Sequence, residues 1–280
     1  MSETDPFRIR AHVPEFDLIS EEYRRASDAA RSRWSARTDM AYGPGPSDRL
    51  DLFFPENADG RCPIHIFVHG GYWRANVKED YAFIANTVCA AGSIAAIVEY
   101  GRLPKMRMAA LVEQVRGAVR WLERNASSFG GNPEAISASG HSAGAHLAFY
   151  LTARGPSETG FQPTPVKSIL LVSGIYDLRP IVSSFLQAEI SLRDDETVEW
   201  SPLNSKPRPG TCITIAVGGK ETRPFIEQAQ ALANMTSSSL QLHIRGADHM
   251  SIVRDMGDAS TQMGCHFREF LETEASIRGY

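Results

Sequence analysis

The sequence predicts an α/β fold with a mostly parallel central sheet and helices on both faces. Short apolar runs rich in branched side chains recur along the chain, and longer segments of helical periodicity separate them. Near-continuous apolar strands joined by crossover helices are what a parallel sheet buried on both faces requires. The predicted strands span residues 64–68, 94–98, 135–138, 168–172, 213–217 and 240–244. The predicted helices span residues 79–91, 107–126, 143–153, 223–236 and 258–275.

Length and charge limit the classes of protein to consider. The 280 residues with 42% hydrophobic content suit one large domain over residues 1–280. The net charge is −4 with both signs interspersed, so no basic face is available for a phosphate backbone and nucleic acid is excluded as a partner. We expect a small-molecule substrate instead, and a homo-oligomer is left open.

Targeting signals and metal motifs are not apparent. The first residues, MSETDPFRIR, are acidic and polar where a secretory signal would need a basic start and an apolar run. No stretch has the length of a membrane span, so we expect a cytoplasmic protein with no membrane contact. The four cysteines lie far apart, unlike zinc or redox motifs, and no cofactor or metal is expected.

Two segments interrupt the alternation of strands and helices. Residues 17–38 are charged and helix-favouring, and they predict an N-terminal helical arm packed on the main body. After a Gly- and Pro-rich break at 42–48, LDLFFP at 50–55 predicts an edge strand. Residues 180–210 are too long for a simple crossover helix, and they predict a small helical insertion that serves as a lid.

The strongest motif is Gly140-His141-Ser142-Ala143-Gly144, which follows a short strand and precedes an alanine-rich helix. Gly-x-Ser-x-Gly at such a turn lifts the serine hydroxyl above the sheet, and only small flanking residues fit there. The motif indicates an α/β-hydrolase fold with Ser142 as nucleophile. The alternative is an ordinary tight turn whose serine caps the helix.

A second loop, His69-Gly70-Gly71-Tyr72-Trp73, follows the strand at 64–68. A glycine pair after a buried strand can aim backbone amides into a cleft, where they stabilise the negative charge of a tetrahedral intermediate. We assign this oxyanion hole to the amides of Gly71, Tyr72 and Ala143. The His69 ring is expected to brace the loop, and a glycine turn that serves chain geometry alone is the alternative.

The nucleophile needs a base and an orienting acid, and the chain order of this fold places both after Ser142. His249 follows the last predicted strand in LQLHIRGADHMSIV, at the sheet edge where the serine turn opens. Glu221 follows the strand at 213–217 and is the first candidate for the acid. Asp177, one strand earlier, and Asp248, beside the histidine, remain alternatives.

Four segments together resemble the arylformamidases, or kynurenine formamidases, of the α/β-hydrolase superfamily. They are HGGYW at 69–73, GHSAGAHLA at 140–148, LVSGIYDLRPIV at 171–182 and ADHMSIV at 247–253. The resemblance implies hydrolysis of N-formylkynurenine to kynurenine and formate, with Ser142 as nucleophile and His249 as base. The family's acid, normally aspartate, falls on Glu221, and this departure leaves the substrate open.

The substrate pocket is assigned to Tyr72, Trp73 and His141, with the aromatic rings stacking on an aryl group. Trp73 has an alternative place in the core between loop and helix. Two other functions remain. One is a carboxylesterase or amidase for short acyl esters or another aromatic amide, with the same chemistry. The other is a catalytically silent hydrolase fold that binds a ligand.

Overall fold

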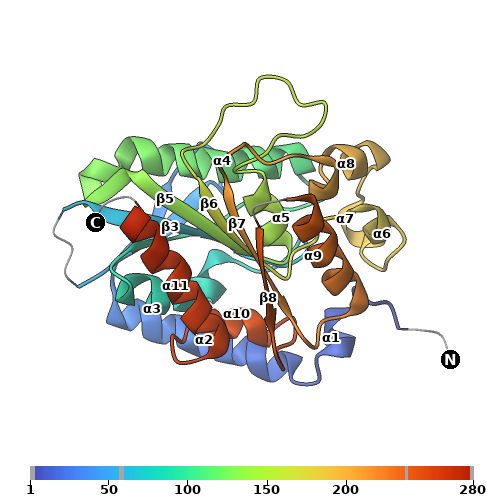
Figure 1. Ribbon diagram of the computed structural model, residues 1–280, viewed down its shortest axis with the longest axis horizontal. Helices are drawn as coiled ribbons and strands as arrows, with labels where there is room; N and C mark the ends of the chain where they lie inside the picture. Colours follow the sequence, from blue (N-terminus) through green and yellow to red (C-terminus); the bar gives the residue numbers. More distant parts are fainter. Residues whose placement is uncertain (1–3, 57–59, 237–238, 278–280) are drawn as a thin grey trace.

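The computed structural model describes residues 4–56, 60–236 and 239–277. An eight-stranded sheet in the order β1-β2-β4-β3-β5-β6-β7-β8 runs through its centre (Figure 1). β1 pairs antiparallel with β2 and β2 with β4, whereas all other neighbours are parallel. The strands are β1 (Ser35–Ala41), β2 (Arg49–Phe54), β3 (Cys62–Val68), β4 (Ile94–Val98), β5 (Gly131–His141), β6 (Ser168–Val172), β7 (Cys212–Gly218) and β8 (Ser239–Ile244).

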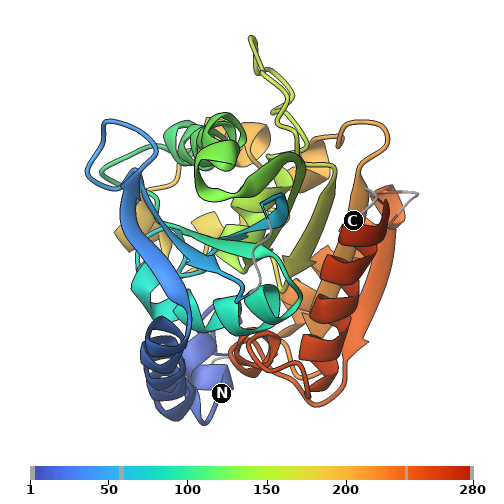
Figure 2. The same cartoon turned by 90° about the vertical axis from the view of Figure 1, so that its left-hand side faces the viewer.

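Helices cover both faces of the sheet (Figures 1 and 2). On one face α4 (Met108–Asn125) contacts α5 (Ala143–Phe149), and on the other α3 (Ala85–Ala90) contacts α11 (Gln262–Ile277). All residues of β4 and β6 are buried between these layers, as strands covered on both faces must be. This is the α/β-hydrolase fold, and the predicted fold class is confirmed.

The predicted elements agree well with the observed ones from residue 62 onward. Each of the six apolar runs lies within one of the strands β3 to β8, and the helices predicted at 107–126 and 223–236 are α4 and α9 (Arg223–Met235). The segment at 79–91 begins as a 3-10 helix, Lys78–Ile84, before α3. The short helix α10 (Ser251–Met256) was not predicted.

The N-terminal arm needs a correction. Helix α2 (Phe16–Arg33), preceded by the short α1 (Ile9–His12), ends before residue 38, and the chain continues as the edge strand β1. The helix stops because Trp34 turns to an extended conformation and its indole donates to the Asn86 side chain at 2.9 Å. β1 is mostly exposed, so it lacks the apolar alternation that reveals a strand. The strand at 50–55, predicted as the edge, is therefore second in the sheet.

The interval at 180–210 contains three short helices between β6 and β7. They are α6 (Arg179–Val182), α7 (Gln187–Ile190) and α8 (Asp194–Glu199), followed by a 3-10 turn at Pro202–Asn204. In Figure 1 they lie at one end of the sheet, beside α9. Whether this insertion acts as a lid depends on its contacts with the cavity described below.

Candidate active site

Ser142 lies at a strained turn between β5 and α5. Its backbone has φ 55° and ψ −120°, a conformation that residues other than glycine rarely adopt. A Cβ at Gly140 would lie 2.3 Å from the Gly144 carbonyl oxygen, and a Cβ at Gly144 would lie 2.0 Å from that of Val68. Because larger residues would force the strand and helix apart, the two glycines are required for this turn.

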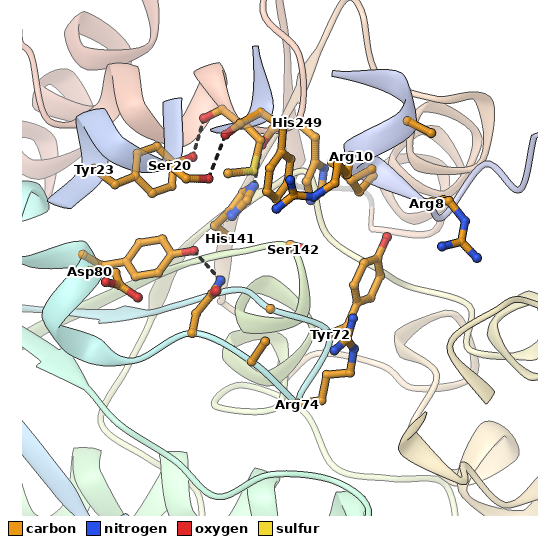
Figure 3. A pocket seen from close by; sticks show the side chains of 18 of the residues that line it. Arg8, Arg10, Ser20, Tyr23, Tyr72, Arg74, Asp80, His141, Ser142 and His249 are labelled. Atoms are coloured by element: carbon orange, nitrogen blue, oxygen red, sulfur yellow. Dashed lines mark hydrogen bonds between the residues drawn. The ribbon is translucent and has the colours of Figure 1, made fainter. Parts of the chain in front are cut away.

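The Ser142 side chain faces a cavity of about 620 Å³ that His249 also lines (Figure 3). The loop after β3 crosses close to the serine, because a Cβ at Gly70 would lie 3.1 Å from the Ser142 Cβ. Within the part of the chain that the structure describes, no hydrogen bond fixes the Ser142 hydroxyl. The hydroxyl is therefore free to rotate toward a base or a bound substrate.

His249 and Glu221 meet where β7 and β8 end. The His249 Nδ1 lies 3.1 Å from each carboxylate oxygen of Glu221. The Glu221 side chain is fully buried and the His249 side chain is 6% exposed. The two loops are tied together, since the Lys220 amide donates to the Ala247 carbonyl oxygen at 2.9 Å. The contact occupies Nδ1 and leaves Nε2 for proton transfer.

The other two predicted acids are occupied elsewhere. The Asp177 carboxylate accepts from Arg179, with its Oδ2 2.6 Å from the guanidinium Nη2. The Asp248 Oδ1 accepts the backbone amides of Met250 and Ser251 at 3.0 and 2.8 Å, at the start of α10. Of the three candidates, Glu221 is thus the carboxylate in contact with the His249 ring.

The loop after β3 presents unpaired backbone amides. Gly71 has φ 119°, and a Cβ there would lie 2.3 Å from the Ala75 carbonyl oxygen. Tyr72 also has positive φ, at 50°. Among the described residues, the amides of Gly71, Tyr72 and Ala143 donate to no acceptor. Such amides beside a nucleophile suit a developing oxyanion.

The His69 ring holds this loop through a hydrogen bond and a ring contact. Its Nδ1 donates to the Gly70 carbonyl oxygen at 2.8 Å, and its ring stacks on Tyr100 with centroids 4.5 Å apart. The Tyr100 hydroxyl donates to the His69 carbonyl oxygen at 2.8 Å. These contacts agree with the bracing role expected for His69.

His141 packs between the nucleophile turn and the base. Its Nε2 donates to the backbone carbonyl oxygen of His249 at 2.9 Å, and the two rings lie 4.7 Å apart. Burial, reinforced by the neighbouring His249, lowers the pKa of His141 well below 6.5, so the ring is neutral. Its Nδ1 is buried without a hydrogen-bond partner and is therefore an acceptor beside the cavity.

The two predicted aromatic pocket residues differ in position. Tyr72 lines the cavity, and its ring meets Phe185 of the insertion edge-on. Trp73 is fully buried and does not line the cavity. Its indole donates to His146 Nδ1 at 3.2 Å. We correct the pocket assignment accordingly: Trp73 fills the core between the loop and α5.

Much of the cavity lining comes from the N-terminal arm, which in the structure comprises residues 4–33 with α1 and α2. The arm supplies Arg8, Ile9, Arg10, Ala11, Phe16, Ser20, Tyr23 and Arg24, whereas the insertion at 180–210 supplies Phe185. Sequence reasoning placed the arm on the main body but missed these lining residues. The signal available was FRIRAHVPEF at 7–16, where basic residues alternate with apolar ones from Phe7 to Val13.

Comparisons with known proteins place the chain in a family. The profile of the BD-FAE family matches residues 50–195, slightly more than half of the chain. The chain belongs to the BD-FAE family. The matched region of this BD-FAE protein includes the loop after β3, the Ser142 turn and the first half of the insertion.

Relatives and solved structures agree with this family. The kynurenine formamidase of Danio rerio is 29% identical over 89% of this chain and 84% of its own length, and esterase LipQ of Mycobacterium tuberculosis is 33% identical over 61% and 46%. An esterase of Pyrobaculum calidifontis superposes with a TM-score of 0.65 at 17% identity, covering 94% of this chain and 92% of its own. This BD-FAE protein is therefore a hydrolase that is similar to kynurenine formamidases and esterases.

The described residues contain neither a candidate membrane span nor a candidate metal cluster. No helix there is both long and apolar enough to span a bilayer. Nor do those residues bring three or more His, Cys, Asp or Glu side chains together as a metal site.

Proposed function

We propose that this protein cleaves aryl formamides such as N-formylkynurenine by a serine mechanism, with Ser142, His249 and Glu221 as the catalytic triad. The observation that carries the proposal is the pairing of His249 Nδ1 with buried Glu221 on a ring that lines the same cavity as Ser142. That arrangement fixes the tautomer that leaves Nε2 as the base.

In the first half-reaction, the Ser142 hydroxyl attacks the formyl carbon and its proton passes to His249 Nε2. The carbonyl oxygen becomes negative and accepts hydrogen bonds from the amides of Gly71, Tyr72 and Ala143. The C–N bond then breaks, and the protonated His249 returns its proton to the departing arylamine. Ser142 is left as a formyl ester, and Glu221 stabilises the imidazolium while it exists.

In the second half-reaction, water replaces the amine. His249 takes a proton from the water, whose oxygen attacks the formyl ester through the same oxyanion hole. The bond to Ser142 breaks, the serine recovers its proton from His249, and formic acid is released, which loses its proton to water and becomes formate. No group beyond these side chains and water is required for the atoms and protons to balance.

The choice of a formamide is supported by the kynurenine formamidases of Danio rerio and Salmo salar, each 29% identical over most of the chain. The chemistry is compatible with ester-type machinery. In a formanilide the nitrogen lone pair is shared with the ring, so the amide is less stabilised than an alkyl amide. Tyr72 and Phe185, which line the cavity, offer aromatic faces for the aryl group.

The second candidate is a carboxylesterase for short acyl groups. It is favoured by the esterase LipQ relative and by the esterase folds among the solved structures. The two candidates differ in the acyl group, because a formyl group needs almost no space beside Ser142. We also propose that the insertion at 180–210 contributes to the cavity's cover through Phe185.

The deciding experiment measures formate release from N-formylkynurenine beside hydrolysis of nitrophenyl esters with acyl chains of increasing length. Wild type should release formate rapidly, and Ser142→Ala should release none above background. A steep preference for larger acyl groups, without formate release, would favour the carboxylesterase.

A further inference from the structure

The cavity that holds Ser142 has a positively charged wall. Four arginines line it, Arg8, Arg10, Arg24 and Arg74, against one carboxylate, Asp80. Figure 3 shows Arg8, Arg10 and Arg74 around the region of Ser142 and His249. A cleft lined by charge of one sign attracts ligands of the opposite sign.

Three of these arginines already have carboxylate partners. Arg10 pairs with Asp17, Arg24 with Glu21 and Arg74 with Glu189. None of the three carboxylates lines the cavity. The partners hold these guanidinium groups and offset much of their charge.

Arg8 differs from the other three. Among the described residues, no ion pair or hydrogen bond involves the Arg8 guanidinium. Its Cζ lies over the face of the Phe185 ring, 4.2 Å from the ring centroid. A planar guanidinium held against an aromatic ring keeps its N–H donors at the edge, where they can meet a carboxylate. Arg8 is therefore an exposed cationic group at the cavity whose N–H donors bond to none of the described residues.

The backbone before Arg8 is anchored to the catalytic elements. The Thr222 hydroxyl, next to Glu221, donates to the Pro6 carbonyl oxygen at 2.9 Å. The Tyr72 hydroxyl donates to the Phe7 carbonyl oxygen at 2.6 Å, and the Phe185 amide donates to the Asp5 carboxylate at 2.7 Å. Arg8 follows directly, so three separate contacts restrain its backbone relative to the catalytic elements.

We propose that Arg8 binds a carboxylate on the leaving group of the substrate, at the side remote from the scissile bond, and so makes the enzyme selective for anionic substrates. This inference rests on the proposed hydrolase function and adds the charge of the substrate to it. A carboxylate can take two parallel N–H bonds from one guanidinium.

The test compares two substrates of the same size. They are 3-formamidophenylacetate and its uncharged carboxamide, and the readout is the ratio of their kcat/KM values. Wild type should prefer the carboxylate about tenfold, mainly through a lower KM, which corresponds to about 1.4 kcal/mol. Added salt should reduce the ratio. In Arg8→Gln the ratio should fall to about one.

Arg25→Gln is the matched control. Arg25 lies on α2 next to Arg24, pairs with Glu21 and does not line the cavity, so this variant loses the same charge and should keep the wild-type ratio. A wild-type ratio near one, or an Arg8→Gln variant with an undiminished ratio, would overturn the inference.

A parallel pair of esters separates this inference from the proposed function. If the formyl pair is not hydrolysed but 3-acetoxyphenylacetate and its carboxamide are, the formamidase proposal fails and the ester ratio still reports the charge preference. Turnover of the formyl pair without a charge preference contradicts the Arg8 inference alone. Turnover of neither pair contradicts both.

Discussion

The Tyr72 hydroxyl donates a hydrogen bond of 2.6 Å to the carbonyl oxygen of Phe7, and so joins the oxyanion loop to the N-terminal arm. Burial raises the pKa of Tyr72 well above its ordinary value of 10.0, so the hydroxyl keeps its proton and remains a donor. One residue thus contributes its amide to the proposed oxyanion hole and its side chain to the position of the arm.

Replacement of this hydroxyl should weaken substrate binding. Tyr72→Phe retains the ring and the backbone amide but loses a hydrogen bond of about 0.5–1.5 kcal/mol, so we expect KM to rise about two- to tenfold. Steady-state kinetics measure the KM of the variant and of wild type. Tyr42→Phe is the matched control, because the Tyr42 hydroxyl also donates to a backbone carbonyl, that of Glu99, away from the cavity. Equal effects on KM in both variants would argue against the arm contact.

Glu221→Gln should lower kcat by a factor on the order of 10³ to 10⁴, as loss of the triad carboxylate does in other serine hydrolases. The amide has the same shape but cannot fix the tautomer or stabilise the imidazolium. The measurement is kcat on the best substrate found. Asp177→Asn, at a carboxylate paired with Arg179, should stay close to wild type. A larger loss in Asp177→Asn than in Glu221→Gln would mean that the acid is misassigned.

Gly144→Ala should damage the nucleophile turn. The added Cβ would lie 2.0 Å from the Val68 carbonyl oxygen, and overpacking of this kind costs about 1–3 kcal/mol or more. We expect a lower free energy of unfolding and at least about a tenfold loss of kcat/KM from displaced Ser142. Gly117→Ala is the control. Gly117 lies within α4, and a Cβ added there would be 3.9 Å from the nearest atom. This variant should have a free energy of unfolding about 0.5–1 kcal/mol higher than wild type.

Stability should fall in acid partly because of His65. This histidine is buried on β3, with its ring nitrogens 2.8 and 2.7 Å from the hydroxyls of Ser137 and Ser139, and burial lowers its pKa from 6.5 to about 3. Between those two pH values the unfolded chain binds a proton that the folded protein does not. The free energy of unfolding therefore decreases as the pH falls through that window, by about 1.4 kcal/mol per pH unit at most.

Urea denaturation at pH 7 and pH 5 measures this dependence. His65→Gln should lose about 2 kcal/mol less than wild type between the two pH values. His243→Gln, at an exposed histidine of β8, should keep the wild-type difference. The same pH dependence in His65→Gln and wild type would contradict the linkage.

The strands from β3 to β8 could be predicted from sequence because each contains a short run rich in apolar side chains. β1 could not, since its exposed polar residues carry no alternation and its pairing with β2 depends on a tertiary contact. The boundary of α2 was missed for the same reason. Its end is set by Trp34 packing beside Asn86, a residue 52 positions away.

The candidate site shows a similar division. Ser142, Glu221 and His249 each follow a strand end, and parallel strands bring those ends to one edge of the sheet, so local motifs and chain order were enough. The pocket lining was harder to predict from sequence. Trp73 turns into the core, and the arm reaches the cavity through contacts between residues 5–7 and Tyr72, Phe185 and Thr222. No local pattern encodes contacts of such sequence separation.

Labelling with a fluorophosphonate, followed by mass spectrometry, tests the central claim most directly. If Ser142 is the nucleophile and His249 its base, wild type should carry one adduct on Ser142, Ser142→Ala should carry none, and His249→Gln should react at least about a hundredfold more slowly. An adduct on another residue, or labelling of His249→Gln at the wild-type rate, would contradict the account.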